Sequence, residues 1–370
     1  MSASTVSADS VKEKVFNNIR LTKEDGLFLY KECDFLDLAG MAKAKKRQLS
    51  GAEVYFNVNC HINLSNVCVS RCKFCAFGRN KEDEGAYSMS PEEAFDYGSA
   101  YVETGITEFH VVSAMHPDRQ FSYYVDVISR LHNAYPHIHI QGFTAVEIYY
   151  FAQISGLSVR QVLTELKNAG LGSMPGGGAE ILNDDIRAGL CPNKAGSREW
   201  LDVHSSAHEL GMKTNCTMLY GHVETLENRI EHMMLLRELQ DQTGGFQAFI
   251  PLPFLPENTG ISHITRTGSL DDLRTIAVSR LMLDNIRHIK AFWIMLTLPI
   301  AQISLDFGAD DLDGTIVEER IMHAANANTE KGISKSHMVD LIKKSGYIPC
   351  ERDTVYNILH RYNEGVTEEI

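Results

Sequence analysis

The chain has 370 residues, of which 44% are hydrophobic and 22% are charged, and its formal net charge at pH 7 is −13. This composition is typical of a globular protein with a large core, and the acidic balance argues against general nucleic-acid binding. The first residues, MSASTVSADS, have no basic start and no apolar segment, and the longest apolar run, 291–301, is too short to span a bilayer. We therefore expect a cytoplasmic protein without membrane contact, in which clustered cysteines indicate metal or redox chemistry rather than disulfides.

Residues 1–10 are small and polar and are expected to be disordered, and residues 11–50 are rich in helix-forming residues. After them, short strand-like runs alternate with longer helical segments. The predicted strands cover 53–59, 108–112, 137–143, 171–174, 213–219, 246–250, 292–296 and 302–306. Eight strands separated by helices predict a parallel (β/α)8 barrel. A doubly wound sheet is the alternative, because the last connection is too short for a helix.

This pattern divides the chain into three parts. Residues 1–50 are predicted to form a disordered start followed by helices, residues 51–330 the α/β barrel, and residues 331–370 helices at the carboxyl end. Ser90, Pro91 and Glu93 have the spacing of a capping box with proline in the first turn, so a helix is predicted to begin at Pro91.

The first predicted strand alternates between polar and apolar residues. Its polar positions are Tyr55, Asn57, Asn59, His61 and Asn63, and its apolar positions are Phe56, Val58, Cys60, Ile62 and Leu64. Successive side chains of a strand point to opposite faces, and a barrel covered by helices has an apolar outer face. The polar set is therefore expected to face the interior, where so many amides and imidazoles predict a ligand cavity.

Three cysteines, Cys68, Cys72 and Cys75, lie close together in the segment NVCVSRCKFCAFGR (66–79). Three thiolates in a C-x3-C-x2-C loop can bind three irons of a 4Fe–4S cluster and leave the fourth iron open. A zinc site completed by His61 or His116 is the alternative. Cys60 is predicted to lie on the outer apolar face. The other cysteines share no metal-like spacing: Cys33, Cys191, Cys216 and Cys350.

A C-x3-C-x2-C loop after the first barrel strand, with an aromatic residue, here Phe74, before its last cysteine, resembles the radical SAM enzymes. The resemblance implies that the open iron binds S-adenosylmethionine and that the reduced cluster cleaves it to methionine and a 5′-deoxyadenosyl radical. It also implies an electron donor such as flavodoxin or ferredoxin. An iron–sulfur electron-transfer protein without a substrate is the alternative from another class, although such proteins usually bind all four irons through protein ligands.

Several further segments narrow the resemblance. They are HINLSNVCVSRCKFCAF, VSAMHPD, FTAVEI, PGGGAEI, TMLYGHVET, RELQDQTGGFQAFIPLPFLPENT and FGADDLDGTIVEE. Together they look like aminofutalosine synthase, the radical SAM enzyme of the futalosine route to menaquinone. Two relatives stay open. One is cyclic dehypoxanthine futalosine synthase, which has Trp and Gln where this chain has Leu252 and Leu255, and the other is the group of deazaflavin-cofactor radical SAM synthases.

The resemblance implies a reaction with 3-[(1-carboxyvinyl)oxy]benzoate. The 5′-deoxyadenosyl radical adds to the vinyl CH2, the aryl group migrates from oxygen to carbon, and one carboxylate is lost as bicarbonate, which gives 6-amino-6-deoxyfutalosine. The substrate is a dianion, and burying an unpaired charge is costly. Candidate partners for it are Asn57, Asn59, His61 and Arg79.

Residues after the predicted strands supply the remaining candidate contacts. Gly176 and Gly177 allow the backbone to approach a cofactor closely. The resemblance implies a ribose contact for Glu180 and a contact with the methionine amino group for Ser113. The alternative for this glycine segment is a tight turn before a helix.

Five histidine, tyrosine and aspartate candidates have weaker signals. His116, Tyr220 and His222 follow strands and are predicted substrate contacts at the cavity rim. Asp310 and Asp313 belong to DDLDGT (310–315), which the resemblance makes a site loop after the last strand. The alternatives are a structural histidine before a proline and a solvated acidic turn.

Overall fold

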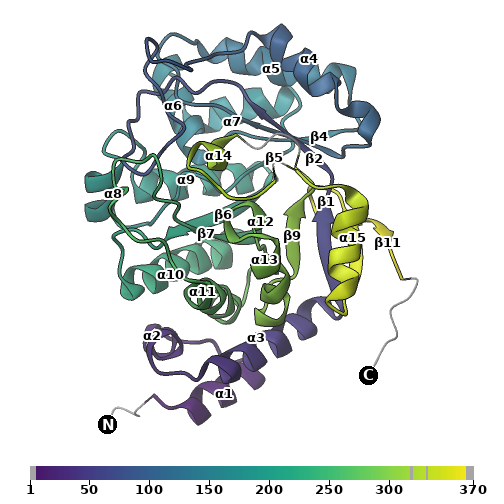
Figure 1. Ribbon diagram of the computed structural model, residues 1–370. Helices are drawn as coiled ribbons and strands as arrows, with labels where there is room; N and C mark the ends of the chain where they lie inside the picture. The colour runs from purple at the N-terminus through teal and green to yellow at the C-terminus, as the bar shows by residue number, and fades with distance from the viewer. Residues whose placement is uncertain (1–5, 317–319, 331, 364–370) are drawn as a thin grey trace.

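The computed structural model describes residues 6–316, 320–330 and 332–363, and Figure 1 shows strands surrounded by helices. One parallel sheet follows the chain order: β2 (Asn59–Asn63), β3 (Glu108–Val112), β4 (His139–Gly142), β5 (Ser173–Met174), β6 (Lys213–Tyr220), β7 (Phe246–Pro253) and β8 (His288–Ile289). A second sheet has the order β11 (Ile358–Arg361), β10 (Ile348–Arg352), β1 (Glu53–Asn57) and β9 (Asp311–Gly314).

The two sheets close into one ring. Only Val58 separates β1 from β2, so one stretch of chain pairs with β9 through its first half and with β3 through its second half. On the other side, the Ala291 N–H donates to the Asp311 carbonyl at 2.8 Å, and Lys290 and Asp311 form a parallel bridge between β8 and β9. The predicted (β/α)8 barrel is confirmed, with β1 and β2 together as its first strand and β9 as its eighth.

The first six predicted strands overlap the barrel strands, but the last two predictions are wrong. Residues 292–296 and 302–306 lie mainly in α12 (Trp293–Leu296), α13 (Leu298–Ser304) and the 3-10 turn η2 (Leu305–Phe307). All four residues of α12 are buried, and a short, fully buried apolar run has no periodicity that separates helix from strand. The true seventh strand has two residues, and the true eighth strand is the acidic segment for which a loop was expected.

The chain ends also differ from the prediction. Helix α1 (Ala8–Phe16) begins inside the segment expected to be disordered, because the Ser7 hydroxyl accepts from the Ser10 N–H at 3.2 Å and caps it. Residues 1–5 lie outside the described ranges. The carboxyl part contains α15 (Lys335–Lys344), as expected, but then continues into β10 and β11 instead of further helices.

The other helices lie outside the strands (Figure 1). Helix α3 packs against α11. Helix α4 begins at Pro91 as predicted, because the Glu93 N–H donates to the Ser90 hydroxyl at 3.1 Å. The bounds are α2 (Lys23–Lys31), α3 (Phe35–Ser50), α4 (Pro91–Ser99), η1 (Val102–Thr104), α5 (Phe121–Ala134), α6 (Ala145–Ser155), α7 (Val159–Asn168), α8 (Asp184–Leu190), α9 (Ser197–Glu209), α10 (Leu226–Thr243), α11 (Ser269–Met282) and α14 (Ile321–Ala324).

The side chains of the first barrel strand point in the directions that their alternation predicts. A methyl group on Gly98 of α4 would lie 3.0 Å from Ile62 Cδ1, so Ile62 faces the helices. Asn57 Nδ2 donates to Glu108 Oε2 at 3.0 Å inside the barrel, and Asn63 lines the cavity. The polar positions therefore face inward.

The turn between β10 and β11 closes the amino end of the barrel. β10 lies parallel to β1. At its last residue, Arg352 Nε donates to Asp311 Oδ2 at 2.7 Å, and in the turn that follows the Tyr356 ring stacks on His288 with centroids 3.8 Å apart. Gln247 also donates to a carbonyl of this turn. One short segment thus reaches the first residues of β7, β8 and β9.

Candidate active site

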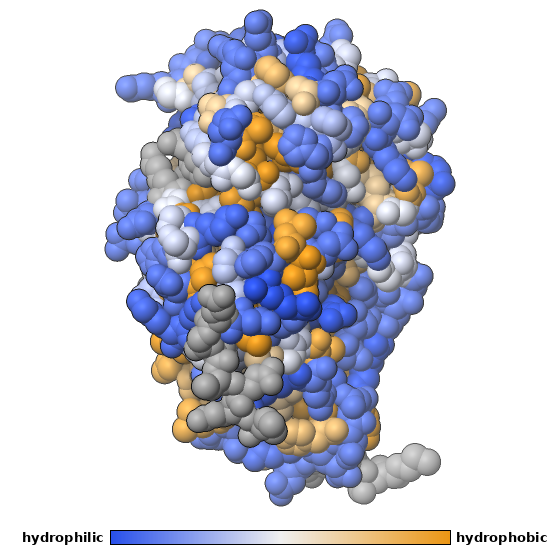
Figure 2. Space-filling model, turned by 90° about the vertical axis from the view of Figure 1, so that its right-hand side faces the viewer, coloured by the Kyte–Doolittle hydropathy of each residue, from blue (hydrophilic) through white to orange (hydrophobic). Residues whose placement is uncertain are grey.

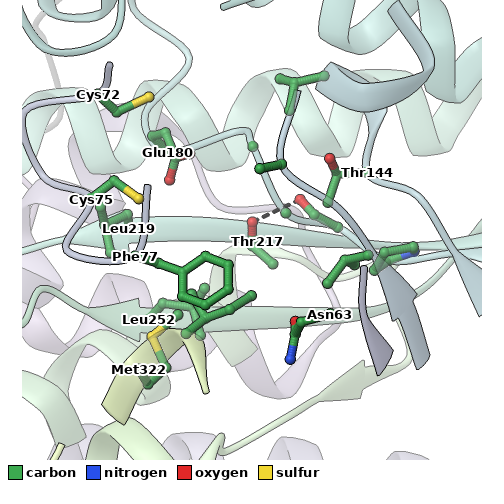
Figure 3. A pocket seen from close by; sticks show the side chains of 18 of the residues that line it. Asn63, Cys72, Cys75, Phe77, Thr144, Glu180, Thr217, Leu219, Leu252 and Met322 are labelled. Carbon is green, nitrogen blue, oxygen red and sulfur yellow. Dashed lines mark hydrogen bonds between the residues drawn. The ribbon is translucent and has the colours of Figure 1, made fainter. Parts of the chain in front are cut away.

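A cavity of about 390 Å3 lies at the carboxyl end of the barrel strands, where the active sites of such barrels are found. Its wall is formed by the loop after β2, by residues at the ends of the other strands, and by part of α14. Cys68, Cys72 and Cys75 all line it. In Figure 3, Cys75 and Glu180 lie on one side of the cavity, and Asn63 lies on the other.

Hydrogen-bond donors point at the sulfur atoms of the cysteine loop. The Ser70 N–H donates to Cys68 Sγ at 3.4 Å, and the Ser70 hydroxyl lies 3.1 Å from Cys72 Sγ. The Gly78 N–H donates to Cys75 Sγ at 3.3 Å. Such donors favour the thiolate form, which is the form that binds iron.

Cys72 is the cysteine whose pKa is lowered most clearly, to about 6. The largest cause is a hydrogen bond with Cys191, and the charge of Lys194 and the hydroxyl of Ser70 act in the same direction, against the effect of burial. Burial raises the pKa of Cys75. Cys191, which is far from the loop in sequence, therefore lies beside it in space.

This donor set fits a 4Fe–4S cluster better than a single ion. Within the described ranges, no three or more His, Cys, Asp or Glu side chains are arranged around one metal position. A cluster does not require such convergence, because each thiolate binds a different iron. His116 does not line the cavity. The zinc alternative completed by His61 or His116 therefore has no support in the described part of the chain.

Two distant segments hold the cysteine loop. The Lys73 N–H donates to the Leu190 carbonyl at 2.8 Å, and the Lys73 carbonyl accepts from the Gly260 N–H at 2.7 Å. Lys194 Nζ lies 5.1 Å from the centre of the Phe74 ring, which lines the cavity. The loop position thus depends on contacts that form only in the complete barrel.

The glycine turn after β5 brings Glu180 into the same wall. Gly176 and Gly177 line the cavity. A methyl group on Gly176 would lie 2.5 Å from Cys216 Cα, so packing against β6 requires glycine there. Glu180 has a left-handed backbone, with φ of 48°, and its Oε1 accepts from Lys194 Nζ at 2.7 Å.

A buried carboxyl group, Glu147, joins the ends of β3 and β4. Its oxygens accept from the Ser113 N–H at 2.6 Å, the Thr144 N–H at 2.7 Å and the Thr144 hydroxyl at 2.6 Å. Burial raises the pKa of Glu147 to about 7 despite these bonds. The Ser113 hydroxyl donates to the Ala114 carbonyl at 2.9 Å. Ser113, Thr144 and Glu147 all line the cavity.

Two imidazoles lie side by side in the barrel interior. His61 of β2 and His110 of β3 are register partners, their ring centroids are 4.6 Å apart, and both line the cavity. His110 Nδ1 lies 3.6 Å from Glu108 Oε1. Asn57 and Asn59 do not line the cavity. Asn57 donates to Glu108, and Asn59 Nδ2 lies 3.4 Å from His61 Nε2.

The acidic segment separates into an inner and an outer aspartate. Asp313 lines the cavity, and its Oδ1 accepts from Lys290 Nζ at 2.7 Å. Asp310 is fully buried away from the cavity, with Arg280 Nη2 at 2.7 Å and His288 Nδ1 at 2.9 Å. Burial raises the pKa of Asp310, but these two neighbours outweigh it and hold the pKa well below its usual range. Asp310 therefore forms a buried ion pair in the protein interior and does not contact the cavity.

The sequence matches the Radical SAM superfamily over residues 62–236 and the CofH/MqnC C-terminal region over residues 243–364. It is 43% identical to an aminodeoxyfutalosine synthase of Thermus thermophilus, covering 94% of both chains. It is 40% identical to an aminodeoxyfutalosine synthase of Streptomyces coelicolor, covering 95% of this chain and 94% of the relative. The chain belongs to the aminodeoxyfutalosine synthase family of radical SAM proteins. The family expected from the sequence motifs is therefore confirmed.

Other relatives of the aminodeoxyfutalosine synthase family differ more. A 5-amino-6-(D-ribitylamino)uracil--L-tyrosine 4-hydroxyphenyl transferase of Methanopyrus kandleri is 38% identical over 87% of this chain and 88% of its own. Among solved structures, methylornithine synthase (PylB) superposes with a TM-score of 0.74 at 16% identity, covering 92% of this chain and 97% of that chain. At that identity the likeness shows the fold alone.

Two predicted substrate contacts instead support the chain around the cavity. Arg79 is not in the cavity wall, and its Nη1 donates to the Ala76 carbonyl at 2.8 Å within the cysteine loop. His116 is also outside the wall, and its Nδ1 accepts from the Asp118 N–H at 3.1 Å. Both residues therefore stabilise loops that follow β2 and β3.

Tyr220 and His222 likewise point away from the cavity. The Tyr220 hydroxyl donates to Asp272 Oδ1 at 2.9 Å, between β6 and α11, and burial raises its pKa. His222 Nε2 lies 3.0 Å from the Leu219 carbonyl. The predicted strand ends at residue 219, but Tyr220 is the last residue of β6, and alternation with Leu219 directs it outward. His222 lies past the strand end, where no periodic pattern defines its direction.

Several cavity residues were not identified from the sequence. Thr144 and Glu147 lie in FTAVEI, a segment used only for the resemblance, and His110 alternates with the apolar residues of β3. Period-2 alternation would have placed His110 on the face of Glu108, so a signal existed. Lys194 and Lys290 have no local signal, because each is brought to the cavity by long-range closure.

Within residues 6–316, 320–330 and 332–363, the structure has no helix with the length and apolar character needed to cross a bilayer. On the face drawn in Figure 2, hydrophilic residues dominate, and hydrophobic residues form separate patches.

Proposed function

We propose that the protein transfers the 5′-deoxyadenosyl group of S-adenosylmethionine to 3-[(1-carboxyvinyl)oxy]benzoate, which gives 6-amino-6-deoxyfutalosine, methionine and bicarbonate in menaquinone biosynthesis. The supporting observation is that two aminodeoxyfutalosine synthases match the chain at 40–43% identity over nearly its whole length. A cytoplasmic location and an electron donor such as flavodoxin or ferredoxin belong to the same proposal.

Cys68, Cys72 and Cys75 would each hold one iron of a 4Fe–4S cluster and leave the fourth iron for S-adenosylmethionine. When bound, the cluster supplies the electron that cleaves S-adenosylmethionine to methionine and a 5′-deoxyadenosyl radical. The protein must keep water and foreign hydrogen donors away from this radical. The mainly apolar wall beside the cysteines suits that task.

The wall residues have separate positioning roles in this proposal. Phe74 and Glu180 would contact the adenosyl group, and Glu180 would accept hydrogen bonds from the ribose hydroxyls. Ser113 would contact the amino group of methionine, and Glu147 fixes the backbone N–H of Ser113. Gly176 and Gly177 leave space along the cofactor, since neither has a side chain.

Addition to the vinyl CH2 requires that carbon to lie about 3–3.5 Å from the radical centre. The barrel wall must therefore hold the aromatic substrate by its far end and keep C–H bonds of other groups at a distance. Leu252 and Leu255, the positions that distinguish this chain from cyclic dehypoxanthine futalosine synthase, both line the cavity. Their place in the wall supports a role in substrate choice.

A second candidate is a reaction that begins with hydrogen abstraction, as in the cyclic dehypoxanthine futalosine synthase alternative. The chain is also 38–39% identical to transferases whose name specifies L-tyrosine. This similarity is the reason to test the hydrogen-abstraction reaction as well. In that reaction the adenosyl radical would leave as 5′-deoxyadenosine. The fate of the adenosyl group therefore separates the two candidates.

The test uses reconstituted, reduced holoenzyme and S-adenosylmethionine labelled in the ribose. With 3-[(1-carboxyvinyl)oxy]benzoate, we expect the label in 6-amino-6-deoxyfutalosine, with one methionine released per product molecule. Free 5′-deoxyadenosine should be a minor product. L-Tyrosine with 5-amino-6-(D-ribitylamino)uracil is the control substrate pair. Label found mainly in free 5′-deoxyadenosine, with the dicarboxylate consumed, would reject the addition reaction.

A further inference from the structure

Among the residues that line the cavity, which also include Arg71 and Glu147, two groups of titratable side chains lie at different depths. One group, Glu180 and Lys194, lies beside the cysteine loop, which leaves the carboxyl end of β2. The other group lies within the strands, where Lys290 follows β8, Asp313 belongs to β9, and His61 and His110 belong to β2 and β3. Because β8, β9, β2 and β3 are neighbours around the ring, these four side chains share one wall.

Lys290 is a buried cation with hydrogen-bonding capacity left. Its side chain is 7% exposed, and its ammonium group is 2.7 Å from Asp313 Oδ1. An ammonium group has three donors, and this bond uses one of them. A buried charge of this kind is stabilised by further polar partners, so the position favours an anionic ligand beside Lys290.

The imidazole pair adds ring N–H donors to the same wall. Glu108 lies on the Nδ1 side of His110, and Asn57 donates to Glu108 from the other side. Burial raises the pKa of Glu108, but His110 and Lys290 outweigh it and keep the group ionised. The Glu108 carboxylate thereby fixes the orientation of the His110 ring. The Nδ1 side of the ring faces Glu108, and the Nε2 side faces away from it.

The rest of the cavity suits an aromatic ring. Its apolar lining includes Val112, Leu219, Ile250, Leu252, Phe254 and Phe292. Figure 3 shows Leu219 and Leu252 near Phe77 in this part of the wall. A flat ring can therefore pack between the cysteine end and the deeper polar wall.

We propose that Lys290, together with His61 and His110, binds the ring carboxylate of the aromatic dicarboxylate substrate. This inference rests on the proposed function, which supplies a substrate with two carboxylates. The vinyl CH2 must lie near the adenosyl group at the cysteine end, and the carboxylate of the enol ether is attached to the neighbouring carbon. The ring carboxylate is the one that extends away from the cysteines, toward the wall that contains Lys290.

The test measures binding to cluster-reconstituted protein by calorimetry, without reductant and without S-adenosylmethionine. The ligands are 3-[(1-carboxyvinyl)oxy]benzoate and 2-phenoxyacrylate, which keeps the enol ether and lacks the ring carboxylate. Lys290→Gln is combined with Asp313→Asn, so that no unpaired aspartate remains, and asparagine tolerates the left-handed backbone of position 313. His110→Gln is the second variant, because it leaves the Lys290–Asp313 ion pair in place.

We expect the double variant to bind the dicarboxylate about tenfold to a hundredfold more weakly, since a hydrogen bond to a charged group is lost. His110→Gln should weaken it less. Both variants should bind 2-phenoxyacrylate and S-adenosylmethionine as the wild type does. Unchanged affinity for the dicarboxylate, or equal losses for both ligands, would overturn the inference. Wild-type protein that binds the dicarboxylate in this assay, but does not convert it once S-adenosylmethionine and reductant are added, would reject the proposed function instead.

Discussion

Lys194 Nζ lies 2.7 Å from Glu180 Oε1, and both side chains line the cavity beside Cys72. Burial lowers the pKa of Lys194, but the charges of Cys72 and Glu180 outweigh it and raise the pKa above its ordinary value. The lysine is therefore a positive charge beside both Cys72, a predicted cluster ligand, and Glu180, the predicted ribose acceptor. It orients Glu180 and stabilises the thiolate of Cys72 at the same time.

The first prediction concerns Glu180. Glu180→Gln should weaken S-adenosylmethionine binding by roughly tenfold or more, because hydrogen bonds to a carboxylate are lost, and should leave the iron content unchanged. Calorimetry with holoenzyme and iron analysis measure the two quantities. Glu165→Gln, on the exposed side of α7, is the matched control. Wild-type affinity in Glu180→Gln would mean that Glu180 serves only the turn and its ion pair.

The second prediction separates the cavity cysteines from Cys60. Alanine at Cys68, Cys72 or Cys75 should abolish 4Fe–4S binding, because one iron loses its protein ligand in each case. Cys60→Ala should keep the cluster and lower the free energy of unfolding by about 1 kcal/mol, since Cys60 is buried outside the cavity wall. Iron content and absorption spectra of the anaerobically reconstituted variants decide the matter. Full iron content in any of the three loop variants would contradict the assignment.

The third prediction uses the buried Lys46. Its Nζ donates to the Leu305 carbonyl at 3.1 Å, and burial lowers its pKa to about 7. The unfolded chain therefore binds the proton more tightly, and the free energy of unfolding should rise as pH increases from about 7 toward 10. Lys46→Met should stabilise the protein at neutral pH by up to roughly 4 kcal/mol, and by less at about pH 9.5.

Denaturant unfolding of wild type and Lys46→Met at both pH values gives the comparison. Near the Leu305 carbonyl the variant keeps the Tyr347 hydroxyl, which lies 3.2 Å from that carbonyl and 2.6 Å from Asp306 Oδ1. A variant that is less stable than the wild type at neutral pH would show that the contacts of the ammonium group outweigh its desolvation.

The fourth prediction concerns Glu147, whose raised pKa makes stability depend on pH in the opposite direction to Lys46. Burial raises the pKa of Glu147 from 4.5 to about 7, so the folded state binds the proton more tightly than the unfolded chain. The free energy of unfolding should therefore fall as pH rises from about 4.5 to 7, by roughly 3 kcal/mol at most. Glu147→Gln should remove this part of the pH dependence. Identical slopes in both proteins would mean that Glu147 is ionised throughout that range.

Much of the fold followed from local patterns, but the cavity wall did not. The alternation from Tyr55 to Leu64 predicted which side chains face inward, because a strand has a fixed period. The acidic segment 310–315 has no apolar alternation, so neither its strand nor the opposite roles of Asp310 and Asp313 could be assigned.

The two lysines of the cavity wall could not be predicted from local sequence patterns either. Lys194 reaches the cavity because residues 190–194 pack on the cysteine loop, and Lys290 because a two-residue strand ends there. Neither position has a periodic signal, since each is defined by a contact with a distant segment. The spacing of Cys191 gives it no predicted role, yet it lies beside Cys72 because residues 190–194 pack on the cysteine loop.

The turn after β10, which stacks Tyr356 on His288, affects the order of events during turnover. With the amino end of the barrel covered by this turn, the described residues leave the carboxyl end, where the cysteine loop lies, as the expected route for ligands. If the proposed contact with Lys290 holds the substrate deep in the barrel, the substrate should bind before S-adenosylmethionine, and methionine should leave before the joined product. The steady-state kinetics should accordingly be ordered and sequential, with excess S-adenosylmethionine acting as an inhibitor.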